Sequence, residues 1–524
     1  MYPNELLLKG FNKINRRMKT AFLSCFVVGL LTHFYMLTNK LPNYDDVNCL
    51  TSYGTGVISG RFMLAILGKG IRVLFGNYSL PWLNGLIGIF FISLSASLTV
   101  YLLDLKHLIN CFFVGTLMIV SPAITGTFFF MFTVPYYAFS ILLTVLSVLL
   151  ATQYKKGFII APVILALSMG IYQAYFPFAA GLFLIILYQN LLNADEYKQI
   201  LKSAALYIFV LALGLIFYIV LSKAAITLLG QRITSYQGLD DMGKISLTEI
   251  PSLIVTAYKN YLLFMVKDIS GMNPYFIIRL FIIILHIIIF ISLISSIKTL
   301  YMQYKGKQAQ WITTGIITFM VLFPMAVNSI YIMANKSNVY SLMLYPTVLI
   351  LVLVVVIMDH IQVRDMNKQL ISLTIQMRKW LCWLGSCLLL TILVSQAYYA
   401  NVQYLAIQMQ YEQAYSYFVT MITQIKMSEG YSMNLPLVII GDNIDDSSFY
   451  DNSYFDDTLS GRTQTLVNIF SRNEFLKTYL GFNPQIEEDV DSWEDLPVVQ
   501  SMPCYPDTKA IQIINGAIVL KLSN

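Results

Sequence analysis

The sequence predicts an all-α polytopic membrane bundle followed by a small C-terminal α/β domain. Of the 524 residues, 57% are hydrophobic and only 12% are charged, and the mean hydropathy is +0.66. Soluble domains carry about 25% charged residues, so this composition indicates a chain that crosses a membrane many times. Residues 1–400 carry 28 Lys and Arg against 12 Asp and Glu, whereas residues 401–524 carry 6 against 16. We therefore expect a membrane domain at 1–400 and a polar, acidic domain at 401–524.

Eleven apolar runs give the predicted membrane spans. A helix needs about 20 apolar residues to cross the hydrocarbon core of a bilayer. Runs close to this length lie at about 20–38, 84–103, 108–122, 135–152, 158–174, 176–192, 203–222, 274–297, 311–331, 340–359 and 381–400. We expect the first run to be a permanent span, because no small-residue cleavage site follows it.

Basic residues set the predicted orientation. Five of them precede the first run, namely Lys9, Lys13, Arg16, Arg17 and Lys19. Cytoplasmic segments carry an excess of Lys and Arg, so the N-terminus is predicted to be cytoplasmic. Each later loop that this assignment places inside is also basic, and eleven spans then put the acidic C-terminal domain outside. The sequence thus predicts a multi-pass protein of the cell membrane with an extracytoplasmic C-terminal domain.

The first predicted outer loop, 39–83, carries a pair of adjacent acids, Asp45 and Asp46. Charged residues beside a bilayer are costly unless they serve a site. Two neighbouring carboxylates repel one another, so burial in a cleft would raise one pKa and make that group a better base. Such a base can accept the proton of a hydroxyl that attacks a glycosyl carbon. The alternative is that the acids cap a helix that starts near Val47.

Basic residues of the predicted outer face are candidates for binding a phosphate. Arg61 and Lys69 lie eight residues apart on the predicted amphipathic helix 57–75, so one helix face can carry both. The guanidinium of Arg61 offers phosphate a bidentate fork, and the preceding Gly60 allows a close approach. Lys336, in a short outer loop, could neutralise a departing phosphate. The alternative for these side chains is snorkelling to lipid headgroups.

Aromatic and amide side chains stand where predicted spans meet the outer face. Tyr136, Tyr137, Tyr172 and Gln173 could hydrogen-bond to a sugar and stack on it, although tyrosines at helix ends are also common in membrane proteins. The chain has no Walker loop, dinucleotide fingerprint or Gly-x-Ser-x-Gly elbow. No metal-ligand spacing is present either. A group transferred outside must therefore arrive in another activated form, such as a lipid-linked phosphate.

The C-terminal domain is predicted to combine one helix with a few strands. Apolar residues recur at steps of three and four through 404–425, which indicates a helix, and 436–441 reads as a buried strand. The segment 511–522 reads as a hairpin with Asn515-Gly516 at its tip. The acidic tract 487–495 is interpreted as solvated surface rather than a calcium site. Elsewhere, 250–266 is expected to be an amphipathic interfacial helix. Whether Cys49 and Cys504 pair is left open by the sequence.

The order of these motifs resembles a known family. A short basic N-terminus and one span precede Asp45–Asp46, Gly60–Arg61 follows fifteen residues later, and Tyr172–Gln173 stands at an outer helix end. Near the C-terminus come Met502-Pro-Cys-Tyr-Pro506 and the segment 511–521. This combination resembles the serotype-converting glucosyltransferases of the Gtr type-II group, within the GT-C class of polytopic glycosyltransferases.

The resemblance implies an inverting transfer of a hexose, glucose or a similar sugar, from a polyprenyl-phosphate carrier to a cell-surface glycan outside the membrane. In that class an aspartate of the first outer loop is the base, which maps onto Asp45 or Asp46, with Asp45 favoured as the first acid. Basic residues hold the lipid phosphate, and Arg61 is the best match. The second acidic motif expected in a later outer loop is matched poorly by Asp240–Asp241, so a divalent metal, Mg²⁺ or Mn²⁺, is left open.

Two other functions are compatible with a polytopic, aromatic-rich chain. A flippase or transporter of lipid-linked glycans would show internal repeats and charges within spans, and neither is seen in the sequence. A glycan polymerase would carry large arginine-rich outer loops rather than an acidic terminal domain. The expected partners are therefore the lipid-linked sugar donor, the glycan acceptor and membrane lipid, and no feature indicates nucleic acid.

Overall fold

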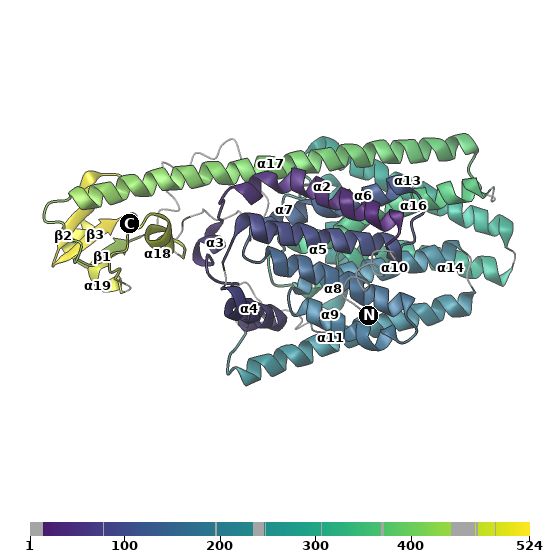
Figure 1. The fold of residues 1–524 in the computed structure, drawn as a ribbon, viewed down its shortest axis with the longest axis horizontal. Coiled ribbons are helices and arrows are strands. Elements are labelled where there is room, and N and C mark those ends of the chain that lie inside the picture. The colour runs from purple at the N-terminus through teal and green to yellow at the C-terminus, as the bar shows by residue number, and fades with distance from the viewer. Residues whose placement is uncertain are drawn as a thin grey trace, which may run out of the picture. The chain divides into compact units, whose positions relative to one another are not determined.

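The computed structural model describes residues 14–523, apart from 77, 194–195, 234–245, 247, 305, 368–370, 442–466, 468–469 and 488 (Figure 1). It divides into two compact units. The helical unit comprises the chain up to Asn39 together with Tyr53–Asn401. The C-terminal unit comprises Val402–Asn524 together with the short segment Lys40–Ser52. Part of the predicted outer loop 39–83 therefore groups with the C-terminal residues and not with the helical unit.

Nine helices of the described residues are long and apolar enough to cross a membrane, and a tenth span results if one bent pair is counted. The nine are α2 (Arg16–Thr38), α5 (Pro81–Leu102), α8 (Val134–Gln153), α10 (Phe176–Leu192), α11 (Tyr197–Leu228), α13 (Phe276–Gln303), α14 (Lys307–Val327), α16 (Val348–Met366) and α17 (Ile375–Met427). Short 3-10 turns extend two of these spans at their N-terminal ends, η2 (Gln173–Tyr175) before α10 and η4 (Ser341–Thr347) before α16. A polytopic helical membrane protein is thus confirmed, whereas the predicted orientation stays a prediction.

Two of the eleven predicted spans do not form a single helix long enough to cross a membrane. The run 108–122 forms α6 (Leu108–Val120) and α7 (Pro122–Phe128), which bend by 43° at Ser121. Proline cannot donate a helix hydrogen bond and its ring displaces the preceding turn, so a break before Pro122 is expected. The run 158–174 forms α9 (Gly157–Met169), a helix of only 13 residues. Hydropathy alone gives eleven apolar runs, but it does not reveal these breaks.

The helices of the helical unit pack in a continuous series. α6 contacts α2, α2 contacts α5, α5 contacts α8, and α8 contacts α9, which packs in turn against α11 (Figure 1). The span of η4 and α16 is buried throughout, whereas α11 leaves most of its apolar surface exposed. An exposed helix that is apolar on all sides suits contact with lipid chains.

Two helices predicted to be amphipathic are present. α12 spans Ile250–Val266, as expected from the sequence. η1 (Val57–Ser59) and α4 (Phe62–Phe75) occupy the range predicted as an amphipathic helix. The first turns of α4 are buried, whereas Val73 and Phe75 near its end are 85% and 79% exposed. Exposed large apolar side chains at this end are typical of an interfacial helix.

The C-terminal unit contains a three-stranded sheet with strand order β1-β3-β2. β1 (Leu437–Ile440) pairs in parallel with β3 (Ala517–Lys521), and β2 (Ile511–Ile514) pairs antiparallel with β3. Asn515 and Gly516 both adopt positive φ at the turn, which confirms the predicted hairpin. The last part of α17 packs against one face of the sheet through Phe418, Met421 and Ile425.

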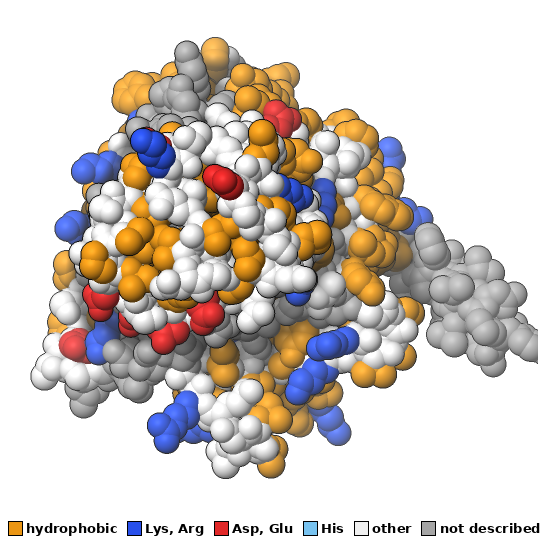
Figure 2. Space-filling model, turned by 90° about the vertical axis from the view of Figure 1, so that its left-hand side faces the viewer, with side chains coloured by type: hydrophobic (Ala, Val, Ile, Leu, Met, Phe, Trp, Pro, Cys, Tyr) orange, Lys and Arg blue, Asp and Glu red, His pale blue; other side chains and the backbone are white. Residues whose placement is uncertain are grey.

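Small elements complete the C-terminal unit. They are α3 (Tyr44–Asn48), α18 (Arg472–Glu474), η5 (Phe475–Tyr479), α19 (Asp491–Glu494), α20 (Pro497–Gln500) and η6 (Thr508–Ala510). Four acids of the predicted surface tract, Asp489, Asp491, Glu494 and Asp495, are exposed. Acidic side chains also gather along one edge of the face in Figure 2. All six cysteines of the chain, Cys49 and Cys504 included, are thiols.

Candidate active site

The acid pair Asp45–Asp46 lies in the first turn of α3, a helix capped by Asn43. The Asn43 Oδ1 atom accepts hydrogen bonds from the backbone N–H groups of Asp45, at 2.8 Å, and Asp46, at 3.0 Å. Asparagine is a favoured N-cap because its short side chain reaches these amides. The helix therefore begins earlier than Val47, and the acids are not its cap.

The two carboxylates differ in burial. Asp46 is only 4% exposed, whereas Asp45 is half-buried. Asp46 lies close enough to Tyr479 for their charges to interact. The pKa of the Tyr479 phenol lies well above its usual range, mainly because the phenol is buried and also because the Asp46 carboxylate is near. The Lys40 Nζ atom lies 4.0 Å from the centre of the same ring, and partial burial lowers the pKa of this ammonium. Asp46 thus belongs to a cluster of polar groups within the C-terminal unit.

Within the helical unit, Arg61 lies over two stacked tyrosines. Arg61 immediately precedes α4, Tyr137 is in the first turn of α8, and Tyr172 precedes η2. The ring centres of Tyr137 and Tyr172 are 4.3 Å apart with planes at 15°. The Arg61 Cζ atom lies 5.2 Å from the Tyr172 centre and 5.9 Å from that of Tyr137, within the range of cation–π interaction. Three segments far apart in the sequence therefore meet at one guanidinium.

Gln173 holds the backbone beside Arg61. Its Nε2 donates to the Ser59 carbonyl oxygen at 3.0 Å and to the Tyr218 hydroxyl at 2.9 Å. Gly60 is needed here because its φ is +70° and because a Cβ would lie 2.7 Å from the Tyr218 hydroxyl oxygen. Both amide protons of Gln173 are used in this way, so the side chain positions Gly60–Arg61.

The start of α4 is held in a second way. The Gly170 carbonyl oxygen, at the end of α9, accepts from the N–H groups of Met63, at 2.9 Å, and Leu64, at 3.2 Å. Amides of the first helical turn have no partner within their own helix, so this carbonyl satisfies two of them. Arg61 is therefore fixed from both sides, through Gln173 and through Gly170.

The guanidinium of Arg61 has a hydrogen-bond donor that no described residue uses. Its Nε atom is buried and makes no hydrogen bond to the described residues. No ion pair joins Arg61 to an acid in the described part of the chain. A buried donor without an acceptor is costly, and few are found in folded proteins. The arrangement suits a bound anion that supplies the missing acceptor.

The contacts described for Arg61 do not include the other predicted site residues of the helical unit, Tyr136, Lys69 and Lys336. Tyr136 is nearly buried and interacts electrostatically with Tyr53. Lys69 is exposed two turns along α4, and Lys336 is exposed after α15 (Ile330–Met333). Neither lysine belongs to the ring and hydrogen-bond contacts that hold Gly60–Arg61. The structure thus brings together Arg61, Tyr137, Tyr172 and Gln173 of the predicted set.

Sequence reasoning missed two tyrosines of this group. Tyr218 accepts from Gln173, and Tyr340 lies close enough to interact electrostatically with Tyr172. Tyr218 lies inside a long apolar run, where one polar side chain is itself a signal. Tyr340 follows Lys336 in the same predicted outer break. Its nearness to Tyr172 depends on tertiary packing that periodicity does not report.

A large apolar cavity of about 500 Å³ lies between α10, α11 and α14. Its lining is almost entirely apolar, and its members include Phe183, Leu187, Ala204, Leu211 and Trp311. Leu211 precedes Tyr218 by two turns on α11, so one helix serves both the cavity and the Arg61 group. A cavity of this volume can hold part of a long hydrocarbon chain.

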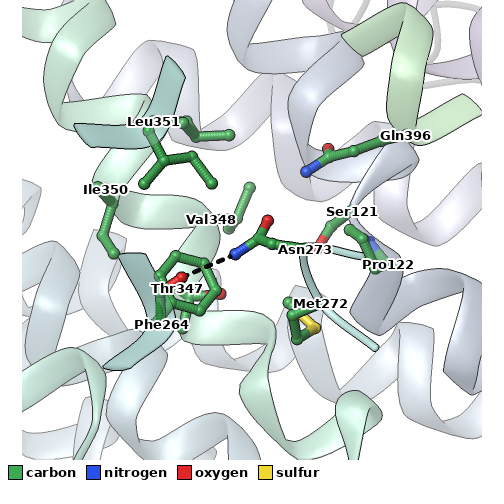
Figure 3. A pocket seen from close by; sticks show the side chains of 11 residues that line it. Ser121, Pro122, Phe264, Met272, Asn273, Thr347, Val348, Ile350, Leu351 and Gln396 are labelled. Carbon is green, nitrogen blue, oxygen red and sulfur yellow. Dashed lines mark hydrogen bonds between the residues drawn. The ribbon is translucent and has the colours of Figure 1, made fainter. Parts of the chain in front are cut away.

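A second cavity is too small for a sugar. It has a volume of about 20 Å³ and is bordered by Asn273, Gln396 and the bend at Ser121–Pro122 (Figure 3). The Asn273 Nδ2 atom donates to the Phe264 carbonyl oxygen at 3.2 Å. Among the described residues, no group of three or more His, Cys, Asp or Glu could hold a metal ion. Asp240 and Asp241 lie outside the described residues.

Comparison with known families agrees with the predicted resemblance. The family model for glucosyl transferase GtrII matches residues 34–358, more than half of the chain. No curated protein and no solved structure matches the chain. The matched range contains the acid pair, Gly60–Arg61 and both stacked tyrosines. The chain therefore belongs to the GtrII family of glucosyl transferases.

Proposed function

We propose that this glucosyltransferase moves a hexose from a polyprenyl-phosphate carrier to a cell-surface glycan, with inversion, at the outer face of the membrane. The observation that carries the proposal is the set of contacts around Arg61. A cation with a buried N–H that lacks an acceptor, held over two stacked tyrosines, is suited to a phosphate group. Membership of a glucosyl transferase family supports the transfer itself.

Arg61 is assigned to the phosphate of the donor. When the bond between the sugar and the phosphate breaks, negative charge grows on the phosphate oxygen. A guanidinium in a partly buried site stabilises this charge more strongly than one in water. The rings of Tyr137 and Tyr172 keep the guanidinium in place, and Gln173 holds the backbone that carries it. Lys69 and Lys336 are assigned a weaker, longer-range attraction for the same phosphate.

The cavity between α10, α11 and α14 is assigned to the isoprenoid chain of the donor. The cavity is apolar, it lies within helices long enough to cross a bilayer, and it shares α11 with the Arg61 group. Burial of a hydrocarbon chain in such an apolar lining is favourable. The phosphate of one donor molecule would then sit at Arg61 while its chain runs along α11.

The acid pair is assigned to the acceptor. In an inverting transfer the acceptor hydroxyl oxygen attacks C1 of the sugar from the side opposite the phosphate. The bond from C1 to the phosphate oxygen breaks, and polyprenyl phosphate leaves with the electron pair. The hydroxyl proton passes to a carboxylate. Asp45 is the preferred base because it is partly accessible, whereas the buried Asp46 is suited to tuning or positioning it. Tyr136 and the two stacked tyrosines are assigned to the sugars.

The experiment that tests the proposal uses purified protein in lipid nanodiscs. Polyprenyl phosphate carrying a radiolabelled glucose is supplied with a cell-surface polysaccharide. We expect label in the polysaccharide and release of polyprenyl phosphate in equal amounts. In proteoliposomes, movement of the labelled lipid between leaflets without transfer would indicate a flippase instead. Joining of glycan units without transfer of a single sugar would indicate a polymerase.

A further inference from the structure

We propose that the C-terminal unit contributes to the transfer reaction, because its hydrophobic core positions the Asp45–Asp46 pair through Val47 and Asn48. The inference rests on the proposed function, since it takes this pair to be the catalytic acids. Val47 and Asn48 act through the carboxylates and are therefore positioning residues.

Val47 is built into the core of the C-terminal unit. Its side chain is 0% exposed and belongs to the same cluster as Phe418 and Met421 of α17, Leu437 of β1 and Phe475 of η5. Successive residues of a helix are separated by about 100° about its axis. Fixing Val47 in the core therefore fixes the directions of the two preceding carboxylates.

Contacts on both sides of the acid pair reinforce this anchor. After the pair, the Asn48 Nδ2 atom donates to the Phe470 carbonyl oxygen at 3.1 Å. Before it, the Lys40 ammonium lies over the ring of Tyr479, which also stacks on Phe475 at 5.3 Å between ring centres. The segment 40–52 is thus held at its start, at Val47 and at Asn48.

The acid pair needs this support. α3 has five residues, and helices of fewer than about 12 residues are unstable in water by themselves. Its cap and first turn alone would not keep α3 in a single orientation. A displacement of about 1 Å at a reacting group can reduce the rate about 100-fold. The core of the C-terminal unit supplies the rigidity that α3 lacks.

The test compares two buried valines of the same unit in the purified full-length protein. Val47 and Val438 are both 0% exposed, but Val438 lies in a separate cluster with Val499 and Val519. We expect Val47→Ala to lower kcat about 10- to 100-fold with little change in the KM for the donor, because only the acceptor side is displaced. Val438→Ala should leave kcat within about twofold while creating a similar cavity. Val47→Ile keeps a β-branched apolar side chain in the core, so its kcat should be much closer to that of the wild type than the kcat of Val47→Ala.

Asn48→Ala serves as a second variant because the Asn48 side chain is exposed and the change leaves the core intact. We expect kcat to fall about fivefold, in proportion to one lost hydrogen bond. Thermal unfolding of each variant shows that the protein is folded. Equal losses in Val47→Ala and Val438→Ala proteins, or wild-type kcat in both Val47→Ala and Asn48→Ala proteins, would overturn the inference.

Two further variants separate this inference from the proposed function. If Asp45→Asn and Asp46→Asn proteins both keep full activity, the acid pair is not catalytic, and the proposed base and this inference fail together. If either Asp variant loses activity while Val47→Ala and Asn48→Ala do not, the proposed function stands and the positioning role alone fails.

Discussion

At the scale of single residues, the Arg61 group is the best-defined part of the candidate site. Gly60, Arg61 and Gln173 could be selected from the sequence because glycine before arginine permits close approach and because polar side chains cluster at span ends. Their pairing could not be predicted, since the hydrogen bonds of Gln173 to Ser59 and Tyr218 join residues 114 and 45 positions apart. The structure also gives Asp45 and Asp46 different surroundings, which their adjacency in the sequence conceals.

Replacing Arg61 tests the phosphate site. Arg61→Ala should raise the KM for the lipid-linked donor and lower kcat/KM about 100-fold, in line with the loss of one charge-assisted contact. Arg61→Lys should recover only part of this, since an ammonium lacks the planar fork. Steady-state kinetics with a range of donor concentrations measure both effects. Full activity in Arg61→Ala protein would mean that this side chain merely snorkels to lipid headgroups.

Replacing Gly60 tests the close approach beside Arg61. Gly60→Ala forces a positive φ on alanine and brings its Cβ to 2.7 Å from the Tyr218 hydroxyl. We expect a loss of about 1–2 kcal/mol in unfolding free energy and weaker donor use. Gly70→Ala is the matched control, because Gly70 lies within α4 and an alanine Cβ there would have no atom within 4 Å. This control should be neutral or slightly stabilising in thermal unfolding.

Replacing Asp45 tests the base. Asp45→Asn keeps the shape of the side chain but removes the proton acceptor, so transfer should fall roughly 10²- to 10⁴-fold while donor binding survives. Asp46→Asn should be milder if the buried acid only tunes or positions its neighbour. Single-turnover transfer and a separate donor-binding assay distinguish the two steps. The reverse ranking of the two variants would exchange the roles of the acids.

At the scale of elements, periodicity predicted most of the helices and the hairpin. α12 and the strands β2 and β3 match their predicted ranges because each has a regular pattern bounded by turn or loop residues. The bend at Pro122 and the shortness of α9 were not predicted, since both segments are apolar throughout and hydropathy responds only to composition. The packing of α3 in the core of the C-terminal unit was not predicted either. A helix of five residues is too short for its apolar pattern to indicate which core it joins.

Filling the cavity between α10, α11 and α14 tests its proposed occupant. Ala204 lines the cavity, whereas the neighbouring Ala205 is exposed on another face of α11. Ala204→Trp should raise the KM for a long-chain polyprenyl donor at least about fivefold and have less effect with a short-chain analogue, since the indole takes the space of the chain. Ala205→Trp should behave like the wild type. Equal effects at both positions would argue against a chain in this cavity.

At the scale of the whole molecule, the chain consists of a helical unit and a C-terminal unit with opposite charge balance. The charge reversal near residue 400 could be read from the sequence and lies close to the break between Asn401 and Val402. The membership of Lys40–Ser52 in the second unit could not, because composition does not report contacts between distant segments. The orientation of the helical unit remains a prediction from its basic loops.

Labelling of single cysteines tests that orientation. In a variant lacking the six native cysteines, a membrane-impermeant thiol reagent should label Ser501→Cys in intact cells and should label Lys307→Cys only after the membrane is opened. Ser501 lies in the exposed part of the C-terminal unit, and Lys307 begins α14 in a predicted cytoplasmic loop. The opposite labelling pattern would place the acid pair in the cytoplasm and exclude transfer at the outer face.

The burial of Val47 and Phe418 in one core also determines when the acid pair becomes ordered during synthesis. Val47 is synthesised 371 residues before Phe418, and at about 5–20 residues per second a ribosome needs roughly 20–75 s to make the intervening chain. Throughout that interval the first span is already made, while α3 has no core to join. The acid pair is therefore ordered only after nearly the whole chain has been translated. In a nascent chain or a premature termination product the carboxylates proposed for catalysis would lack the position that this core gives them, so on that proposal synthesis itself would delay the onset of activity.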